Sequence, residues 1–284
     1  MSPPVRPAWL LAGFLRAAAA LASAALGASS SASLAQGLHV TASLVAATRS
    51  VDPGGQLHVA LRQQIEPGWH TYWSNPGDSG LPTTIDWALP QGFKAGSIAW
   101  PTPKRINYGP VVDYGYENEV LLPVTIEVPS NLQLGGSVML SAHASWLVCA
   151  DTCIPEDAEL SLSVPVAAVA EPDPYWSERI ASTRAHTPVP NPFPTTVTLT
   201  DDKVVLHVAT GDAGRLRDVM FFPAAPDVID DDAPQAATAG PQGLILTLHR
   251  NAVKAPPADL KGVLVFRDSA AQIEAEPQAI MISA

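Results

Sequence analysis

The chain has 284 residues, with 16 Lys and Arg against 27 Asp and Glu, which gives a formal net charge of −11. That length allows one or two domains with a sizeable buried core. Only 15% of the residues are charged and 47% are hydrophobic, so most of the chain is expected to fold. The acidic balance argues against nucleic acid and anionic lipid as partners, since both need clustered Lys and Arg. Two cysteines are too few for a disulfide-dense scaffold or a zinc site with four thiolates.

The N-terminal segment has the order of a secretory signal. Arg6 and Arg16 make a basic start without acidic residues, and an uncharged run rich in Ala and Leu follows at 17–28. Small residues come next, so we expect a signal peptide at 1–35 cleaved after Ala35, with cleavage after Ala32 nearly as favourable. A membrane anchor would need about 20 apolar residues. We therefore expect export to an oxidising compartment, where a cysteine pair can form a disulfide.

Short alternating runs, bounded by Gly, Pro, Asn and Asp, follow the signal without sustained helical periodicity. The runs are 57–61, 84–87, 120–128, 138–148 and 159–166. Regular short strands with turn residues between them predict an all-β fold, an antiparallel β-sandwich whose edges and turns tolerate Pro. We assign this first domain to residues 36–168.

Six prolines crowd the stretch 171–194, and its middle, 175–185, can form one short helix. We interpret 169–194 as a Pro-rich linker. Alternation resumes in five runs: 195–200, 203–209, 218–222, 244–249 and 262–266. They predict a second, smaller β-sandwich domain at 195–284, a spacer or docking surface without cysteine.

An acidic run, Asp230-Asp231-Asp232, lies between the expected strands of the second domain. A calcium-binding loop would place acids at alternating positions with a distal Glu, and this run does not. We expect a solvated loop there.

Cys149 and Cys153 lie between two alternating runs, with Ala-Asp-Thr between them. A strand–turn–strand unit would place the two sulfurs across a hairpin, where opposed Cα atoms lie about 4.5–5.5 Å apart, within disulfide reach. In a helix, residues four apart would also share a face. A disulfide is feasible in both arrangements.

The close spacing of the cysteines bears on what their disulfide does. Closing a five-residue loop stabilises a fold by only about 2 kcal/mol in the chain-entropy model. A tight pair suits thiol–disulfide exchange better, because the second sulfur can resolve a mixed disulfide on the first. Asp151 between the cysteines opposes thiolate formation. A structural hairpin clip and, less favoured, a metal-binding pair remain as alternatives.

Other candidate residues have structural interpretations at this stage. His143 lies six residues before Cys149, about 20 Å along a strand, which is too far for proton transfer, so we expect a sheet-face residue. The aromatic block Trp69, Tyr72 and Trp73 precedes a turn-rich stretch, and we favour a core plug over a place beside the cysteines. His and Met are scattered without clusters, so we expect no bound metal and no cofactor.

Two motifs resemble a known family. The segment 146–156, Trp-Leu-Val-Cys-Ala-Asp-Thr-Cys-Ile-Pro-Glu, and the segment 68–82, Gly-Trp-His-Thr-Tyr-Trp-Ser-Asn-Pro-Gly-Asp-Ser-Gly-Leu-Pro, are similar to the N-terminal periplasmic domain of the DsbD family of disulfide reductases. The ScsB-like branch, linked with copper tolerance, is the closer likeness. The resemblance covers residues 37–168 well and the second domain more loosely.

The resemblance implies an immunoglobulin-like sandwich whose pair, Cys149 and Cys153, carries reducing equivalents in the periplasm. In the family, a membrane electron-relay domain reduces the pair, which then reduces thioredoxin-fold partners such as disulfide isomerases and cytochrome-maturation thioredoxins. Family precedent makes the C-terminal thiol, Cys153, the one that forms the mixed disulfide. The better-known branch has a wider cysteine spacing, so the order of attack does not transfer directly.

Family members also cover the pair with a cap loop that bears an aromatic residue. The matching region here is 107–116, in which Tyr108, Tyr114 and Tyr116 are the candidates. An aromatic lid would exclude stray thiols until a partner displaces it. The alternative is that the Tyr-Gly pairs simply build a turn.

The chain departs from the family plan, because neither the multi-span relay domain nor the C-terminal thioredoxin domain is present. We expect either a stand-alone form supplied by a separate membrane protein or one segment of a longer product. Two other functions remain open: a secreted immunoglobulin-like binding module with a structural disulfide, and a periplasmic copper(I) carrier.

Overall fold

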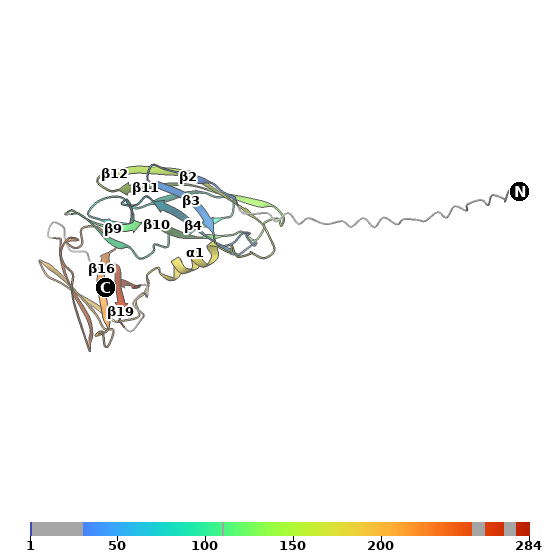
Figure 1. Ribbon diagram of the computed structural model, residues 1–284. Coiled ribbons are helices and arrows are strands. Elements are labelled where there is room, and N and C mark those ends of the chain that lie inside the picture. The colour runs from blue at the N-terminus through green and yellow to red at the C-terminus, as the bar shows by residue number, and fades with distance from the viewer. Residues whose placement is uncertain (2–30, 110, 252–258, 270–276) are drawn as a thin grey trace.

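The computed structural model describes residue 1 and residues 31–109, 111–251, 259–269 and 277–284 (Figure 1). The expected signal segment therefore lies mostly outside the described residues. Its expected cleavage point, Ala35, falls inside strand β2 (Leu34–Gln36), which follows the two-residue strand β1 (Ser31–Ala32). No helix among the described residues has the length and apolar character needed to cross a membrane.

Two antiparallel sheets form the first β-sandwich. The larger sheet has the order β1-β12-β11-β5-β9-β8, with β6 paired to β11. Its further strands are β5 (His70–Gly77), β6 (Thr84–Ala88), β8 (Lys104–Tyr108), β9 (Val111–Glu117), β11 (Ser137–Cys149) and β12 (Cys153–Pro165). The smaller sheet has the order β2-β3-β4-β10-β7, with β3 (Val40–Ala46), β4 (Gln56–Ile65), β7 (Lys94–Ala95) and β10 (Glu119–Glu127).

The apolar core of this sandwich comes from alternate residues of both sheets. Leu44, Leu61 and Leu122 point inward from the smaller sheet, while Leu140 and Leu162 point inward from the larger one. Burial of one such leucine stabilises the fold by about 1.5–3 kcal/mol. The alternation seen in the sequence is therefore the inward and outward alternation of the strands.

A second, smaller sandwich follows, built from two four-stranded sheets. One has the order β13-β20-β19-β16, with β13 (Val189–Pro190), β16 (Leu216–Pro223), β19 (Lys261–Asp268) and β20 (Gln278–Ser283). The other has the order β14-β15-β18-β17, with β14 (Thr195–Leu199), β15 (Lys203–Val208), β17 (Ala236–Gly240) and β18 (Gly243–His249). The predicted all-β architecture, an immunoglobulin-like antiparallel sandwich followed by a smaller one, is confirmed.

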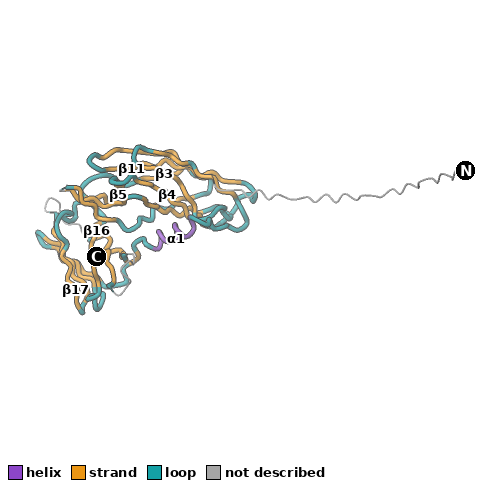
Figure 2. Tube along the Cα trace, viewed as in Figure 1, coloured by secondary structure: helices purple, strands orange, loops and turns teal. Residues whose placement is uncertain are grey.

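A single described helix, α1 (Trp176–Ala185), connects the two sandwiches and is drawn in purple in Figure 2. Asp173 caps its start, because Asp173 Oδ1 accepts hydrogen bonds from the backbone N–H groups of Tyr175 and Trp176. Ile180 is buried against the smaller sheet of the first sandwich. The helix expected in the linker is therefore formed, and it is packed against the first sandwich.

The two sandwiches also contact each other directly. Phe222 of β16 packs its ring edge-on against Tyr114 and Trp73, with ring centroids 4.9 and 6.3 Å apart. Asn75 at the end of β5 donates a hydrogen bond of 2.8 Å to the backbone oxygen of Pro223. The apolar cluster of the first sandwich thus extends across the junction to Phe222, Val263 and Val265, while the second sandwich has a core cluster of its own.

The region 107–116, in which we expected a cap loop or a turn, consists mostly of the end of β8 and most of β9, which pair as a hairpin with a turn at Gly109. One expectation from the sequence is wrong. Asp231, expected in a solvated loop, is only 4% exposed and lies against the first sandwich. Neither local pattern reveals the neighbouring strand or domain that buries it.

Candidate redox site

The two cysteines lie at the end of a long β-hairpin. Strands β11 and β12 pair without interruption from Ser137, opposite Pro165, to Cys149, opposite Cys153. The cysteine Cα atoms are 4.1 Å apart and the two sulfurs form a disulfide. The hairpin arrangement predicted from the sequence is confirmed, and the helical alternative is wrong.

The two sulfurs have different surroundings. Cys149 is only 2% exposed, because β5 runs beside it and His70 is its partner across the ladder. Cys153 and the preceding residues Asp151 and Thr152 are exposed. A molecule approaching from solvent therefore reaches Cys153 first.

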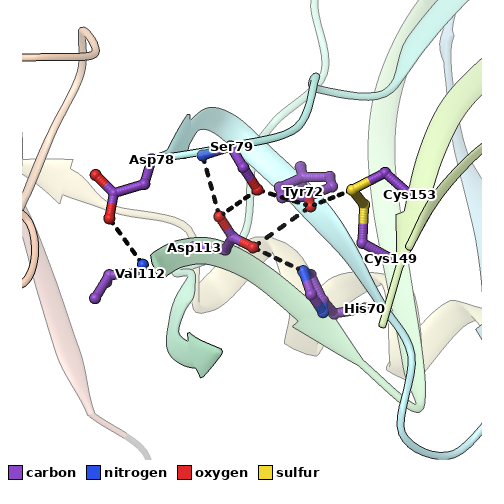
Figure 3. Close-up of polar contacts among 8 residues, drawn as sticks. All are labelled: His70, Tyr72, Asp78, Ser79, Val112, Asp113, Cys149 and Cys153. Atoms are coloured by element: carbon purple, nitrogen blue, oxygen red, sulfur yellow. Dashed lines mark hydrogen bonds and ion pairs between the residues drawn. A yellow bond between two sulfur atoms is a disulfide. The ribbon is translucent and has the colours of Figure 1, made fainter. Parts of the chain in front are cut away.

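Tyr72 lies next to the exposed sulfur. Its hydroxyl oxygen is 3.6 Å from Cys153 Sγ, and its ring is fully buried (Figure 3). Burial raises the pKa of Tyr72 to about 12, opposed by the hydrogen bond with Ser79 and reinforced by the negative charge of Asp113. Tyr72 therefore keeps its proton at neutral pH and can donate it in a hydrogen bond.

Asp113 of β9 joins three side chains behind the disulfide. Its Oδ2 lies 3.1 Å from His70 Nε2 and accepts a hydrogen bond of 3.4 Å from the Tyr72 hydroxyl. Its Oδ1 accepts a hydrogen bond of 2.8 Å from Ser79 Oγ. Asp113 and His70 are buried, so this polar network is shielded from water and strengthened by the low local dielectric (Figure 3).

The loop after β5 fixes this network from one side. Asp78 Oδ2 accepts a hydrogen bond of 2.8 Å from the backbone N–H of Val112, and the Asp78 N–H donates to the Val112 oxygen at 3.0 Å. Gly80 lies directly on the Tyr72 ring, where a Cβ atom would be 2.2 Å from Tyr72 Cζ. Gly80 also has φ +84°, which side chains rarely adopt, so this contact requires glycine.

The cap hairpin, which we define as β8 and β9, contacts the loop between the two cysteines through Tyr108. The Tyr108 hydroxyl donates a hydrogen bond to Asp151 Oδ1, between the two cysteines, and Tyr108 is 42% exposed. Tyr114 and Tyr116 are buried and bond elsewhere, to Asp231 and to the backbone oxygen of Pro101. Of the three tyrosines named from the sequence, Tyr108 is the one that bonds to the cysteine hairpin, at Asp151.

Three residues of this site were not identified by sequence reasoning: His70, Tyr72 and Asp113. Tyr72 of the aromatic block is fully buried, as a core role requires, and its hydroxyl also lies beside Cys153, so the two interpretations hold together. His70 and Tyr72 are two residues apart in β5, so their side chains lie on one face, but the sequence carries no alternation there because the residues between and after them are buried too. His143, expected on the sheet face, pairs there with Asp157 at 3.2 Å, away from the cysteines.

No group of three or more His, Cys, Asp or Glu side chains in the described part of the chain is placed to hold a metal ion. What the arrangement offers chemically is one exposed sulfur, one buried sulfur bonded to it, and a hydrogen-bond donor beside the exposed one. These features are suited to thiol–disulfide exchange.

Comparisons with known proteins agree with this chemistry. The profile of the family described as thiol:disulfide interchange protein DsbD, N-terminal, matches residues 41–165. No curated protein gives a sequence match. The solved N-terminal periplasmic domain of ScsB from Proteus mirabilis is 18% identical with a TM-score of 0.60, over 88% of this chain and 96% of that chain.

Two further solved structures are more distant. The yeast GGA1_GAE domain-P21 is 10% identical with a TM-score of 0.28, over 46% of this chain and 97% of that chain. Spo0M, a sporulation control protein from Bacillus subtilis, is 8% identical with a TM-score of 0.20, over 90% of both chains. These scores are too low to bear on fold or function. Residues 41–165, by the profile match and by the fold shared with the ScsB domain, form an N-terminal domain of the DsbD family.

Proposed function

We propose that this protein passes reducing equivalents through Cys149 and Cys153 to thioredoxin-fold partners in the periplasm. The observation that carries the proposal is the asymmetry of the pair, with Cys153 exposed at the end of the hairpin and Cys149 only 2% exposed beneath β5. A disulfide that serves only as a clip does not need one accessible sulfur backed by a polar network.

The exchange proceeds in two displacements. In the reduced protein, the Cys153 thiolate attacks a partner disulfide, forms a mixed disulfide and releases one partner thiolate, which takes up a proton. The Cys149 thiolate then attacks Cys153 Sγ, re-forms the internal disulfide and releases the second partner thiol. Two electrons pass to the partner, and a membrane electron-relay domain or protein restores them.

Tyr72 supports the step in which Cys153 carries negative charge. Its hydroxyl lies 3.4 Å from Asp113 Oδ2, 3.4 Å from Ser79 Oγ and 3.6 Å from Cys153 Sγ, so its single proton can be donated to only one of them at a time. When Cys153 becomes a thiolate, Tyr72 can donate to the sulfur, which favours the charged form. His70 Nε2 contacts the same oxygen, Asp113 Oδ2, and holds the carboxylate in place.

Tyr108 serves as the cap. Its hydrogen bond to Asp151 holds the tip of the cap hairpin on the loop between the cysteines. A protein partner that docks on the loop between the cysteines has to displace this contact, so the cap favours a docking partner over stray thiols. Disulfide isomerases and cytochrome-maturation thioredoxins are the partner classes we propose.

Trapping a mixed disulfide tests the proposal. The Cys149→Ser variant keeps the exposed sulfur but cannot resolve, so it should accumulate a covalent complex with a periplasmic disulfide isomerase of thioredoxin fold. Cys153→Ser is the matched control and should accumulate far less, because its remaining sulfur is buried. Equal trapping by both variants, or none by either, would contradict the proposal and leave a structural disulfide in a binding module.

A further inference from the structure

We propose that the second sandwich positions the cap hairpin, and that Asp231 is the positioning residue through which it does so. The inference rests on the proposed exchange at Cys153, because a cap matters only where the sulfur beneath it reacts. It gives the second sandwich a part in controlling access to the disulfide.

Asp231 contacts both strands of the cap hairpin. Its Oδ1 accepts a hydrogen bond of 2.7 Å from the Tyr114 hydroxyl of β9, and its backbone oxygen accepts one of 3.1 Å from Arg105 Nη2 of β8. Asp231 itself lies in the segment between β16 and β17 of the second sandwich and is only 4% exposed. Buried hydrogen bonds of this kind are costly to break.

The two anchored residues are partners in the hairpin itself. Arg105 lies directly opposite Tyr114 in the β8–β9 register, and opposed residues of an antiparallel pair point to the same face. Asp113, the neighbour of Tyr114, points to the other face and into the redox site. One strand thus presents one face to the second sandwich and the other face to the disulfide.

Apolar packing supports the same anchor. The ring of Phe222 lies 4.9 Å from the ring of Tyr114. Phe222, Val263 and Val265 of the second sandwich belong to the apolar cluster of the first one. Tyr114 of the anchored pair Arg105–Tyr114 therefore packs against this apolar cluster. Tyr108 lies three residues beyond Arg105, about 10 Å away along the strand. The end of the hairpin at Tyr108 can therefore move only as far as the contacts of Arg105 and Tyr114 allow.

On this proposal, the rate at which a small phosphine reductant reduces the Cys149–Cys153 disulfide depends on how firmly the cap hairpin is held beside it. Asp231→Ala removes the acceptor of Tyr114 and should speed reduction on the order of tenfold. Asp231→Asn keeps an acceptor oxygen and should restore the slow rate. Asp201→Asn, an exposed acid of the second sandwich, is the matched control and should leave the rate unchanged.

A double-mutant cycle separates positioning from general loosening. Tyr108→Ala removes the cap contact and should be fast on its own, and Asp231→Ala should add nothing further to it, since both act on one closed state. If Asp231→Ala does not fold, Tyr114→Phe removes the same hydrogen bond and should also speed reduction. A wild-type rate in Asp231→Ala or Tyr114→Phe, or effects that multiply with Tyr108→Ala, would overturn the inference. The phosphine needs no protein partner, so these outcomes are independent of mixed-disulfide trapping.

Discussion

At the scale of residues, the proposed exchange depends on a few side chains at the end of the hairpin. Cys149 is buried and Cys153 is exposed, so a partner would meet Cys153 first. Tyr72, held in place by Gly80 and Asp113, offers a proton to the exposed sulfur. The reactivity of Cys153 is therefore expected to depend on one hydroxyl.

Tyr72→Phe removes that hydroxyl and should raise the pKa of the Cys153 thiol in the reduced Cys149→Ser background. The hydrogen bond favours the thiolate, so its loss favours the neutral thiol and slows alkylation at pH 7 by about three- to tenfold. The measurement is the rate of iodoacetamide alkylation against pH. Tyr175→Phe, an exposed tyrosine beside α1, is the control, and identical pH profiles for all three proteins would exclude the role.

Among the elements, β11 and β12 were predictable from the sequence and β5 and β9 were not. Along β11 and β12, side chains alternate between the core and solvent, so apolar and polar residues alternate in the sequence with a period of two. In β9, five consecutive residues from Val112 to Tyr116 are buried, and in β5 four, from His70 to Trp73. A strand that is buried on both faces has no apolar–polar alternation, so its sequence pattern does not identify it as a strand.

The same reasoning applies to the site. The alternating runs on both sides of Cys149 and Cys153 predicted the hairpin, and the close spacing of the two cysteines made a disulfide feasible there or in a helix. Asp113 is 36 residues before Cys149 and reaches the site only through the β5–β9 pairing, which carries no local sequence signal. The polar network behind the disulfide therefore required the structure.

The loop after β5 holds the cap hairpin in place through Asp78. Asp78→Ala removes the acceptor of the Val112 N–H and should raise amide hydrogen exchange at Val112 on the order of tenfold. Asp212→Ala, which removes a comparable bond to the Gly214 N–H in the second sandwich, is the control and should leave Val112 protected. Unchanged exchange at Val112 in Asp78→Ala would show that the loop does not hold the hairpin.

At the scale of the whole molecule, the second sandwich contacts the first one and buries some of its residues. Asp231 was expected to be solvated because nothing in an acidic run reveals a partner 117 residues earlier in the chain, Tyr114. Burial, against the lowering effect of the hydrogen bond from Tyr114 and with help from the nearby acids Asp78, Asp230 and Asp227, raises the pKa of Asp231 to about 6. Arg105 is the cation on the facing strand.

A raised carboxyl pKa makes this junction stronger in acid. The contribution is fully present below pH 3.8, the ordinary value, and is lost as the pH rises through about 6. Relative to Asp231→Asn, the wild type should therefore lose roughly 1–3 kcal/mol of stability between pH 4 and pH 7.5. Urea unfolding of both proteins across this range measures the difference, and a constant difference would contradict the assignment.

The reduction potential of the Cys149–Cys153 pair tests the central claim most directly. The purified protein is equilibrated with glutathione or thioredoxin buffers of known potential, and the reduced fraction is read by thiol alkylation. A pair that exchanges with thioredoxin-fold partners should titrate at about −180 to −270 mV. A bond that stays closed until below about −300 mV would be a structural clip, and the account of this protein as a carrier of reducing equivalents would be wrong.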